Sequence, residues 1–342
     1  MDSKLFLHRV RSRDTDAASS AQAGARFLAA ADMQRLRHLE FSTARRVRGT
    51  FSGRHSSRQR GQSVEFNDYR QYIPGDDPAD VDWKVYGRSD RLFIKLYEHE
   101  SELTTTILVD GSASMAFRGC SAPATGVKVF GARGKRVVHE ARSKFDVAGS
   151  VAAALAFLLV QRNDRVALGV ACSGLTSYEG PGVSMLHLQR LLGAMDRHAP
   201  TGSARLPEAI DGIVRRSRRR GILVVVSDFL DDIDPTIAAL AHAGARGHEI
   251  VLFQILHEEE LNLPRGGNGL FIDAESSEQV RVHLDDIRVE YELGMAKFLD
   301  RMKRVSTGLG MDRTLLHTGE DHCAVLQRYL LRRSVGGGTR RG

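Results

Sequence analysis

The chain has 342 residues, of which 42% are hydrophobic and 27% are charged. This length and composition suit a soluble globular protein with one large domain or two modest ones, and they exclude a mini-protein, a collagen and a long disordered chain. The formal net charge of +7 is mild, so a nucleic-acid-binding function would need local clusters of basic residues.

The N-terminal third predicts a loose arm followed by a small subdomain. Residues 1–22 are polar and rich in small residues, which indicates the arm, and Met1 to Val10 is not followed by the apolar segment of a secretion signal. A helix is predicted from Gly24 to about Arg45, and we assign residues 23–102 to this helix together with a β-rich segment. No apolar run reaches the roughly 18 residues of a membrane span, so we expect a cytoplasmic protein without membrane insertion.

From Leu103 onward, short apolar runs alternate with helical stretches, as in a parallel sheet covered by helices on both faces. The predicted strands are Thr104 to Val109, Arg165 to Ala171, Ile222 to Ser227, Glu249 to Leu256 and Arg313 to His317. The predicted helices are Phe145 to Gln161, Ser184 to Arg197, Leu206 to Arg218, Pro235 to Ala245, Leu284 to Arg304 and Ala324 to Arg332. Right-handed crossovers give an α/β, doubly wound, mostly parallel sheet over residues 103–332.

Three further segments complete the chain. Two β-like pieces, Gly269 to Asp273 and Gln279 to His283, predict a hairpin at one edge of the sheet. Residues 118–142 are glycine-containing and basic, without a helical or strand period, and predict an inserted loop. Residues 333–342 are predicted to be a flexible basic tail. His317, His322 and Cys323 lie close in sequence, but their spacing matches no common zinc pattern.

Polar residues follow the first buried strand at alternate positions. Ligands of an open parallel sheet bind beyond the carboxyl ends of its strands, where Asp110, Ser112 and Ser114 are expected. Asp228 ends another buried strand at the same edge, and such oxygen ligands suit Mg²⁺ or Mn²⁺. The alternative is that Ser112 and Ser114 cap the next helix while Asp110 accepts backbone hydrogen bonds, and the spacing leaves both readings open.

Two sequence stretches resemble known families. The loop DGSASM after TTTILV is similar to the metal-ion-dependent adhesion site of von Willebrand factor A domains. The stretch EFNDYRQYIPGDDPADVDWKVYGRSDRLFIKLYEHE, from Glu65 to Glu100, resembles the signature of domain-of-unknown-function family number 58. Members of that family are bacterial proteins often encoded beside MoxR-type AAA+ ATPases. The resemblance implies a von Willebrand factor A-like fold with a small N-terminal β-rich subdomain.

The resemblance also implies a ligand set. Ser112 and Ser114 would bind the ion directly, while Asp110 and Asp228 would act through water or from outside the coordination shell. A threonine ligand is expected before the helix that begins near Leu206, but Ala204 stands at that position and Arg205 stands where an acid is usual. Either Thr201 or Ser203 replaces the threonine, or the site is a recognition surface without an ion.

These observations predict a non-enzymatic, protein-binding adaptor whose partner is a MoxR-type AAA+ ATPase, its client, or both. In sites of this kind an acidic side chain of the partner completes the ion's coordination, and we expect Arg205, Asp76 and Asp77 to help form the partner surface. One alternative is a nucleic-acid-binding module that uses the basic insert and the Arg-rich linker at 48–62. The other is a phosphoryl-transfer enzyme with Asp110 as nucleophile.

Overall fold

The computed structural model describes residues 26–39, 41, 65–72, 81, 83–98, 103–119, 127–130, 136–139, 142–217, 219–231, 233–264, 266–272 and 279–336. The chain divides into two compact units: Met1–Ser42 together with Leu103–Gly342, and Thr43–Glu102. The N-terminal helix therefore belongs to the large unit and not, as predicted, to the β-rich segment. The predicted arm at 1–22 lies outside the described residues.

Six strands form the main sheet, in the order β12-β9-β8-β3-β6-β7. They are β3 (Thr104–Asp110), β6 (Arg165–Ala171), β7 (Leu175–Gly182), β8 (Gly221–Ser227), β9 (Glu249–Leu256) and β12 (Asp312–His317). All neighbours are parallel except β7, which runs antiparallel to β6. The α/β, doubly wound, mostly parallel fold is thus confirmed. β7 was not predicted because it is a half-exposed edge strand containing Gly180 and Pro181, residues that an edge tolerates.

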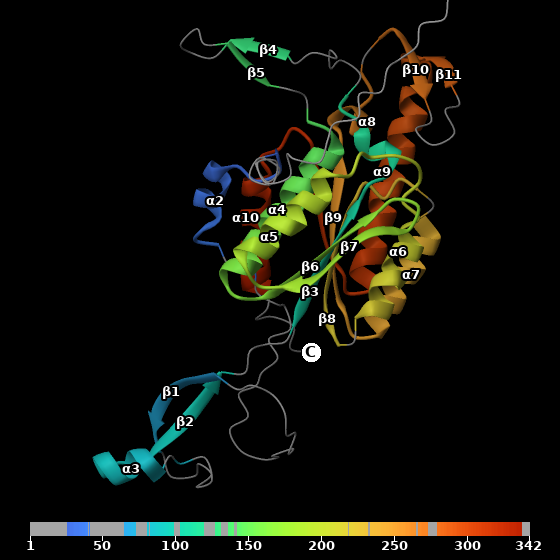
Figure 1. The fold of residues 1–342 in the computed structure, drawn as a ribbon. Coiled ribbons are helices and arrows are strands. Elements are labelled where there is room, and N and C mark those ends of the chain that lie inside the picture. Colours follow the sequence, from blue (N-terminus) through green and yellow to red (C-terminus); the bar gives the residue numbers. More distant parts are fainter. Residues whose placement is uncertain are drawn as a thin grey trace, which may run out of the picture. The chain divides into compact units, whose positions relative to one another are not determined.

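Helices cover both faces of this sheet (Figure 1). One face carries α2 (Ala30–Leu36), α4 (Lys144–Gln161), α5 (Met185–Asp196) and α10 (His322–Gly336), and the other carries α6 (Leu206–Arg216), α7 (Ile233–Ala245) and α9 (Leu284–Gly308). Side chains alternate between the faces with the period of two that a strand imposes. In β3, for example, Ile107 and Val109 enter the first core while Leu108 enters the second.

The helix α4 is the most apolar element of the described chain. It is long and apolar enough to cross a membrane by length and composition, but 94% of its most apolar window is buried within the protein. Its apolar residues lie between the sheet and the neighbouring helices α2, α5 and α10. Burial on all sides accounts for the absence of a polar stripe.

The N-terminal and C-terminal helices differ from their predicted extents. Within the described residues 26–39 and 41, the helix predicted from Gly24 to Arg45 is present as α2 alone, which begins at Ala30 and ends at Leu36. The predicted tail is wrong for residues 333–336, because α10 continues to Gly336. The Arg333 guanidinium is buried, and it pairs with the Glu249 carboxylate and, at 3.2 Å, with that of Asp312. Residues 337–342 lie outside the described part of the chain.

Two small hairpins accompany the large unit. The predicted hairpin is confirmed as β10 (Asn268–Ile272) paired with β11 (Gln279–His283). Its predicted place at an edge of the main sheet is wrong, because the two strands form a sheet of their own. The second lies in the basic insert, where β4 (Val127–Phe130) pairs antiparallel with β5 (Arg136–His139). The loop prediction is wrong at these positions. The two short valine-containing runs were not recognised as strands because glycine and basic residues surround them.

The smaller unit consists of a two-stranded antiparallel sheet and one helix in its described part. Strand β1 (Glu65–Gln71) pairs with β2 (Phe93–Glu98), and α3 (Trp83–Ser89) lies between them in the chain. The segment predicted as β-rich therefore contains a helix as well. Asp76 and Asp77, predicted to form part of the partner surface, lie outside the described residues.

Candidate functional site

The candidate site lies where the strand order of the main sheet reverses. The chain leaves β3 for β6 on one side and later adds β8 on the other side of β3 (Figure 1). Ligands of open α/β sheets bind at the carboxyl ends of the strands at such a point. Asp110 is the last residue of β3, and Asp228 directly follows β8. The two predicted carboxylates therefore reach the same edge from adjacent strands.

Asp110 is held as a buried acceptor, with 2% of its surface exposed. One carboxylate oxygen accepts the N–H of Ser112 at 2.8 Å, and the other accepts the Ser227 hydroxyl. Burial, followed by the charge of Asp228, raises the pKa of Asp110 to about 6, although these hydrogen bonds oppose the shift. With both oxygens engaged below the surface, Asp110 is poorly placed for the alternative role of nucleophile.

The two predicted serines connect Asp110's loop to Asp228. The Ser114 hydroxyl donates to Asp228 Oδ2 at 2.7 Å, and the hydroxyl oxygens of Ser112 and Ser114 lie 3.1 Å apart. Ser112 precedes the short 3-10 helix η3 (Ala113–Ala116), but its side chain makes no capping hydrogen bond. The serines therefore belong to a polar cluster with Asp228, and the capping alternative holds only in that Asp110 accepts a backbone N–H.

A buried lysine that the sequence analysis did not assign to the site completes this cluster. Lys144 is the first residue of α4, and its side chain has no exposed surface. Its ammonium donates to Asp228 Oδ2 at 2.7 Å and to Glu260 Oε1 at 2.6 Å, and it lies 6.0 Å from the centre of the Phe117 ring. Burial alone lowers the pKa of Lys144, but the charges of Asp228 and Glu260 outweigh it and raise the pKa above its ordinary value.

Local structure fixes the positions of Lys144 and Glu260. Ser143 caps α4, because its hydroxyl oxygen accepts the N–H of Asp146. In return, the Asp146 carboxylate accepts the N–H of Ser143 at 2.9 Å. This cap starts the helix at Lys144, one residue before the predicted start. Glu260 lies in α8 (Glu258–Leu261), and its second oxygen accepts the N–H of His257 at 2.8 Å. In the sequence, Lys144 could have been recognised as a candidate site residue because it follows a capping serine directly and begins an apolar helix.

The loop before α6 does not bring its predicted ligands to the cluster. The Thr201 hydroxyl lies 3.5 Å from the sulfur of Cys172, and the Ser203 hydroxyl donates to Asp231 at 3.2 Å. Ala204 is buried and has no side-chain oxygen. The Arg205 guanidinium pairs with the exposed carboxylate of Glu208 at 2.9 Å. Among the described contacts, none provides a substitute for the missing threonine.

These donors do not fit a divalent ion held as the resemblance implies. The oxygen expected from a threonine is replaced by the methyl group of Ala204. The Asp228 oxygen that faces Ser114 already accepts a buried ammonium at 2.7 Å. A divalent cation beside Ser114 would therefore lie close to a fixed positive charge in a region of low dielectric, where like charges repel strongly. The chain supplies a cation of its own at this site.

The loops around the cluster are joined by backbone hydrogen bonds. The N–H of Ala113 donates to the carbonyl of Gly202 at 2.8 Å, and the N–H of Thr201 donates to the carbonyl of Gly111 at 3.0 Å. A Cβ atom on Gly111 would lie 3.1 Å from Val170, so the close approach of strand β6 favours glycine there. We call the loops at 111–114, 201–205, 228–231 and 257–261 the β3–β8 rim.

Strained backbone is concentrated near this rim. Three of the five described non-glycine residues with positive φ lie near it, namely Ser173 (56°) after β6, Arg205 (48°) before α6 and Phe229 (56°) after β8. The left-handed conformation costs roughly 1–2 kcal/mol for a residue with a Cβ. Phe229 keeps it while buried, with its N–H donating to Ser227 Oγ at 2.9 Å. Such strain is found most often at functional sites.

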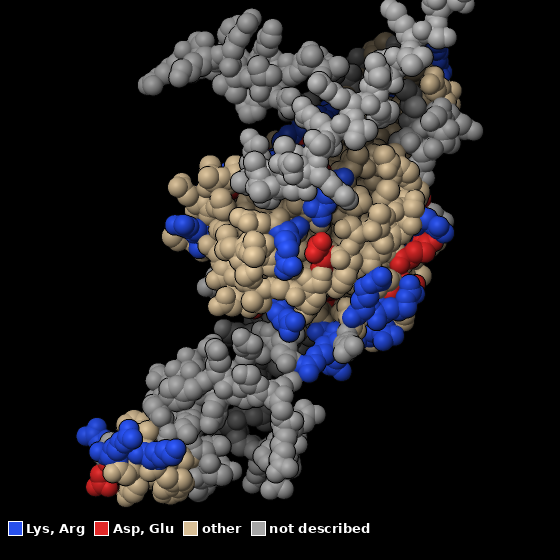
Figure 2. Space-filling model, in the orientation of Figure 1, with Lys and Arg blue, Asp and Glu red and all other residues tan. Residues whose placement is uncertain are grey.

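The basic clusters lie elsewhere. Residues 48–62 lie outside the described chain, and only the backbones of β4 and β5 are described between residues 120 and 141. A third group, Arg215, Arg216, Arg219 and Arg220, is exposed at the end of α6 and the start of β8. Figure 2 shows Lys and Arg side chains gathered over this part of the molecule. It lies at the edge of the sheet opposite to the β3–β8 rim, because β8 begins there.

Comparisons with known proteins place the chain among uncharacterised relatives. Residues 68–298 match the sequence model of a family described as "Protein of unknown function DUF58". Uncharacterized protein Rv1480 of Mycobacterium tuberculosis is 28% identical over 305 residues, which cover 88% of this chain and 89% of that protein. Uncharacterized protein MAV169 of Mycobacterium avium is 30% identical over 142 residues, which cover 40% of this chain and 82% of that protein.

Solved structures with a similar arrangement are more distant. The conserved hypothetical protein BatB of Bacteroides thetaiotaomicron has 13% identity and a TM-score of 0.40, covering 68% of this chain and 99% of that one. A von Willebrand factor type A structure from Catenulispora acidiphila has 10% identity and a TM-score of 0.38, covering 72% of this chain and 44% of that one.

Proposed function

This chain belongs to the DUF58 family, and we propose that it is a protein-binding adaptor that contacts its partner through the β3–β8 rim. The observation that carries the proposal is the rim itself. Backbone hydrogen bonds join the loop at 111–114 to the loop at 201–205, next to the buried cluster of Asp110, Asp228 and Lys144. A surface fixed in advance loses little conformational entropy when a partner binds, which favours recognition.

The proposed partner surface is the exposed side of the rim. Leu230 follows Phe229 with 40% of its surface exposed. The exposed acid Asp231 comes next in the chain, and the exposed Glu258 belongs to another loop of the rim. An apolar residue bordered by charges is a common composition for the centre and edge of a binding patch. Because Lys144 is buried and already pairs with Asp228 and Glu260, the polar cluster itself offers no open cation to an acidic partner group. We therefore propose that the partner contributes apolar and basic side chains.

The proposed partner is a MoxR-type AAA+ ATPase, or a client protein delivered to it. Support comes from the sequence resemblance described above, since relatives of this kind are often encoded beside such ATPases. Binding, and not catalysis, is proposed because the carboxylates of Asp110, Asp228 and Glu260 are engaged by hydroxyl, amide or ammonium donors. Among the described residues, the exposed group of Arg215, Arg216, Arg219 and Arg220 lies at the opposite edge of the sheet and adds no basic surface for nucleic acid to the rim.

Affinity purification of the full chain with a MoxR-type AAA+ ATPase from the same organism tests this proposal. Leu230→Arg is expected to weaken binding at least about tenfold, because it places a charge at the centre of the proposed patch. The matched control is Leu309→Arg, which changes a leucine of similar exposure (47%) before β12, at the opposite edge of the sheet. A chelator is expected to leave binding unchanged.

Each other result has a defined meaning. If the ATPase does not bind the unaltered protein, the proposed partner is wrong. If Leu230→Arg and Leu309→Arg bind equally well, the proposed surface is wrong. If the chelator releases the ATPase, a divalent ion takes part in binding and the ion-independent account of the rim is wrong.

A further inference from the structure

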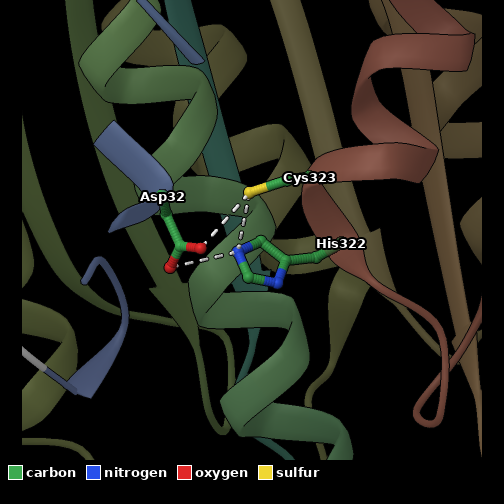
Figure 3. Close-up of side chains that lie close together, drawn as sticks. All are labelled: Asp32, His322 and Cys323. Carbon is green, nitrogen blue, oxygen red and sulfur yellow. Dashed lines mark hydrogen bonds and ion pairs between the residues drawn. The ribbon is translucent and has the colours of Figure 1, made fainter. Parts of the chain in front are cut away.

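A second group of ligand-type side chains lies away from the rim, where α2 packs beside α10. Asp32 comes from α2, and His322 and Cys323 come from the first turn of α10. Figure 3 shows the three side chains pointing toward one another from the two helices. His322 and Cys323 are buried, and Asp32 is partly buried. Nothing in the function proposed above uses these residues.

The spacing of the three groups is that of ligands around one metal ion. Cys323 Sγ lies 3.5 Å from Asp32 Oδ1 and 3.4 Å from His322 Nε2, and His322 Nε2 lies 3.7 Å from Asp32 Oδ2. Tetrahedral zinc with Zn–S near 2.3 Å and Zn–N or Zn–O near 2.0 Å requires separations of about 3.3–3.6 Å between ligand atoms. The three separations therefore match a shared ion with only small adjustments.

The surrounding structure holds these ligands in place. The Asp321 carboxylate accepts the N–H of Cys323 at 3.0 Å, which fixes the first turn of α10. Arg35 of α2 pairs with the same Asp321 and so ties the two helices together. Asp32 also accepts, through Oδ2, the N–H of Ala29, the residue that precedes α2, at 3.2 Å. A ligand carboxylate that is itself hydrogen-bonded is the usual arrangement in metal sites.

The charges around the cluster leave Asp32 without a cation of its own in the described contacts. Arg35 is paired with Asp321, and Arg142 donates to the carbonyl of Asp146 and to the Ser150 hydroxyl. Burial lowers the pKa of His322, the remaining basic group, and Arg142 and Arg35 act in the same direction while the charges of Asp32 and Asp321 oppose it. Burial, followed by the charge of Asp32, raises the pKa of the Cys323 thiol to about 12.

We propose that Asp32, His322 and Cys323 form a binding site for a divalent transition-metal ion of the Zn²⁺ type. A thiolate and an imidazole select such ions over Mg²⁺ and Ca²⁺, which prefer oxygen ligands alone. Three protein ligands leave a fourth position for water or another small ligand. Binding releases the thiol proton to solvent, and the ion joins the N-terminal helix of the large unit to its last helix.

Titration of the metal-free, full-length protein with Co²⁺ tests the site directly. Co²⁺ replaces Zn²⁺ in tetrahedral sites and reports a bound thiolate through a sulfur-to-cobalt charge-transfer band. We expect the band to saturate at one Co²⁺ per chain and to disappear when Zn²⁺ displaces it. Cys323→Ser is expected to abolish the band, and His322→Gln to weaken binding at least about tenfold, since loss of supporting residues alone costs 10–100-fold.

The matched control is the combined variant Cys120→Ser and Cys172→Ser, which removes the other two cysteines of the chain and should keep both the band and its stoichiometry. Circular dichroism verifies that each variant is folded. A band that is absent from the unaltered protein, that survives Cys323→Ser, or that disappears in the control variant overturns the proposal. If Cys323→Ser does not fold, His322→Gln with unaltered affinity overturns it equally.

Discussion

The β3–β8 rim and the Asp32–His322–Cys323 cluster lie in the same unit and both gather acidic and polar side chains, but they differ in the source of positive charge. At the rim, the Lys144 ammonium contacts Asp228 and Glu260 at 2.6–2.7 Å. At the helix cluster, the nearby arginines contact other partners and the thiol carries its proton. At the rim, the loop that resembles a metal-binding motif lies beside a cation of the protein itself, the Lys144 ammonium. At the helix cluster, Asp32, His322 and Cys323 have the spacing of metal ligands although they match no sequence motif.

Replacement of Lys144 is expected to have the largest effect. Lys144→Met leaves the carboxylates of Asp228 and Glu260 without their shared cation in a buried site. Breaking a buried ion pair by removing one partner costs about 3–5 kcal/mol, so the free energy of unfolding should fall by about that amount in urea denaturation. The double variant Lys144→Met with Asp228→Asn should recover part of the loss. A loss below about 1 kcal/mol is incompatible with Lys144 as the cation of the rim.

The protonation of Asp110 gives the next largest effect. Its folded pKa of about 6 lies above the ordinary value of 3.8, so the folded protein binds this proton more tightly than the unfolded chain does. The contribution is fully present below about pH 4 and is lost as the pH rises to 6, at about 1.4 kcal/mol per pH unit. Relative to Asp110→Asn, the unaltered protein should therefore lose stability across this window. Parallel stability profiles for the two proteins would show that Asp110 is not perturbed.

Zn²⁺ binding is expected to change the stability of the protein by a smaller amount, and the change should depend on the helix cluster and not on the rim. At a free concentration a hundredfold above its dissociation constant, an ion that binds only the folded state stabilises it by about 2.7 kcal/mol. We expect Zn²⁺ to raise the melting temperature of the unaltered protein but not that of Cys323→Ser. Mg²⁺ should leave both melting temperatures unchanged. A rise caused by Mg²⁺ that requires Ser112 would instead indicate an ion at the rim.

The smallest expected change in stability comes from relieving backbone strain. The rim contains residues with positive φ, whereas the described residues of α2 and α10 do not. Arg205 has φ of 48° and ψ of 53° and is exposed. Arg205→Gly removes the cost of the left-handed conformation and adds some unfolded-state entropy, so a net gain of about 0.5–1 kcal/mol is expected. The exposed ion pair with Glu208 contributes little to the balance. Differential scanning calorimetry measures the change, and destabilisation would contradict this account of the strain.

Much of the fold was predictable because it depends on local patterns. Buried parallel strands are continuous apolar runs, so Arg165–Ala171 and Glu249–Leu256 were predicted to the residue. Asp110 and Asp228 could be assigned to one edge because parallel strands end together. The half-exposed strand β7 and the hairpin β4–β5 were missed because exposure and basic composition weaken the alternation that identifies a strand.

The remaining features depend on contacts between distant parts of the chain. Lys144 meets Asp228 across 84 residues and Glu260 across 116, and Cys323 meets Asp32 across 291. No local spacing records such pairings, so the motif at Asp110 predicted an ion without revealing the ammonium already beside it. The short separation of His322 and Cys323 likewise gave no zinc pattern, because their third partner belongs to the other end of the chain.

The central claim, that the cation of the β3–β8 rim is Lys144, is tested most directly by Mn²⁺ titration of metal-free protein. Electron paramagnetic resonance follows the free ion, and the Cys323→Ser background removes the helix cluster as a competing site. The account predicts that free Mn²⁺ rises from the first addition, with no stoichiometric binding and no change on Ser112→Ala. One tightly bound Mn²⁺ per chain, lost in Ser112→Ala, would contradict it.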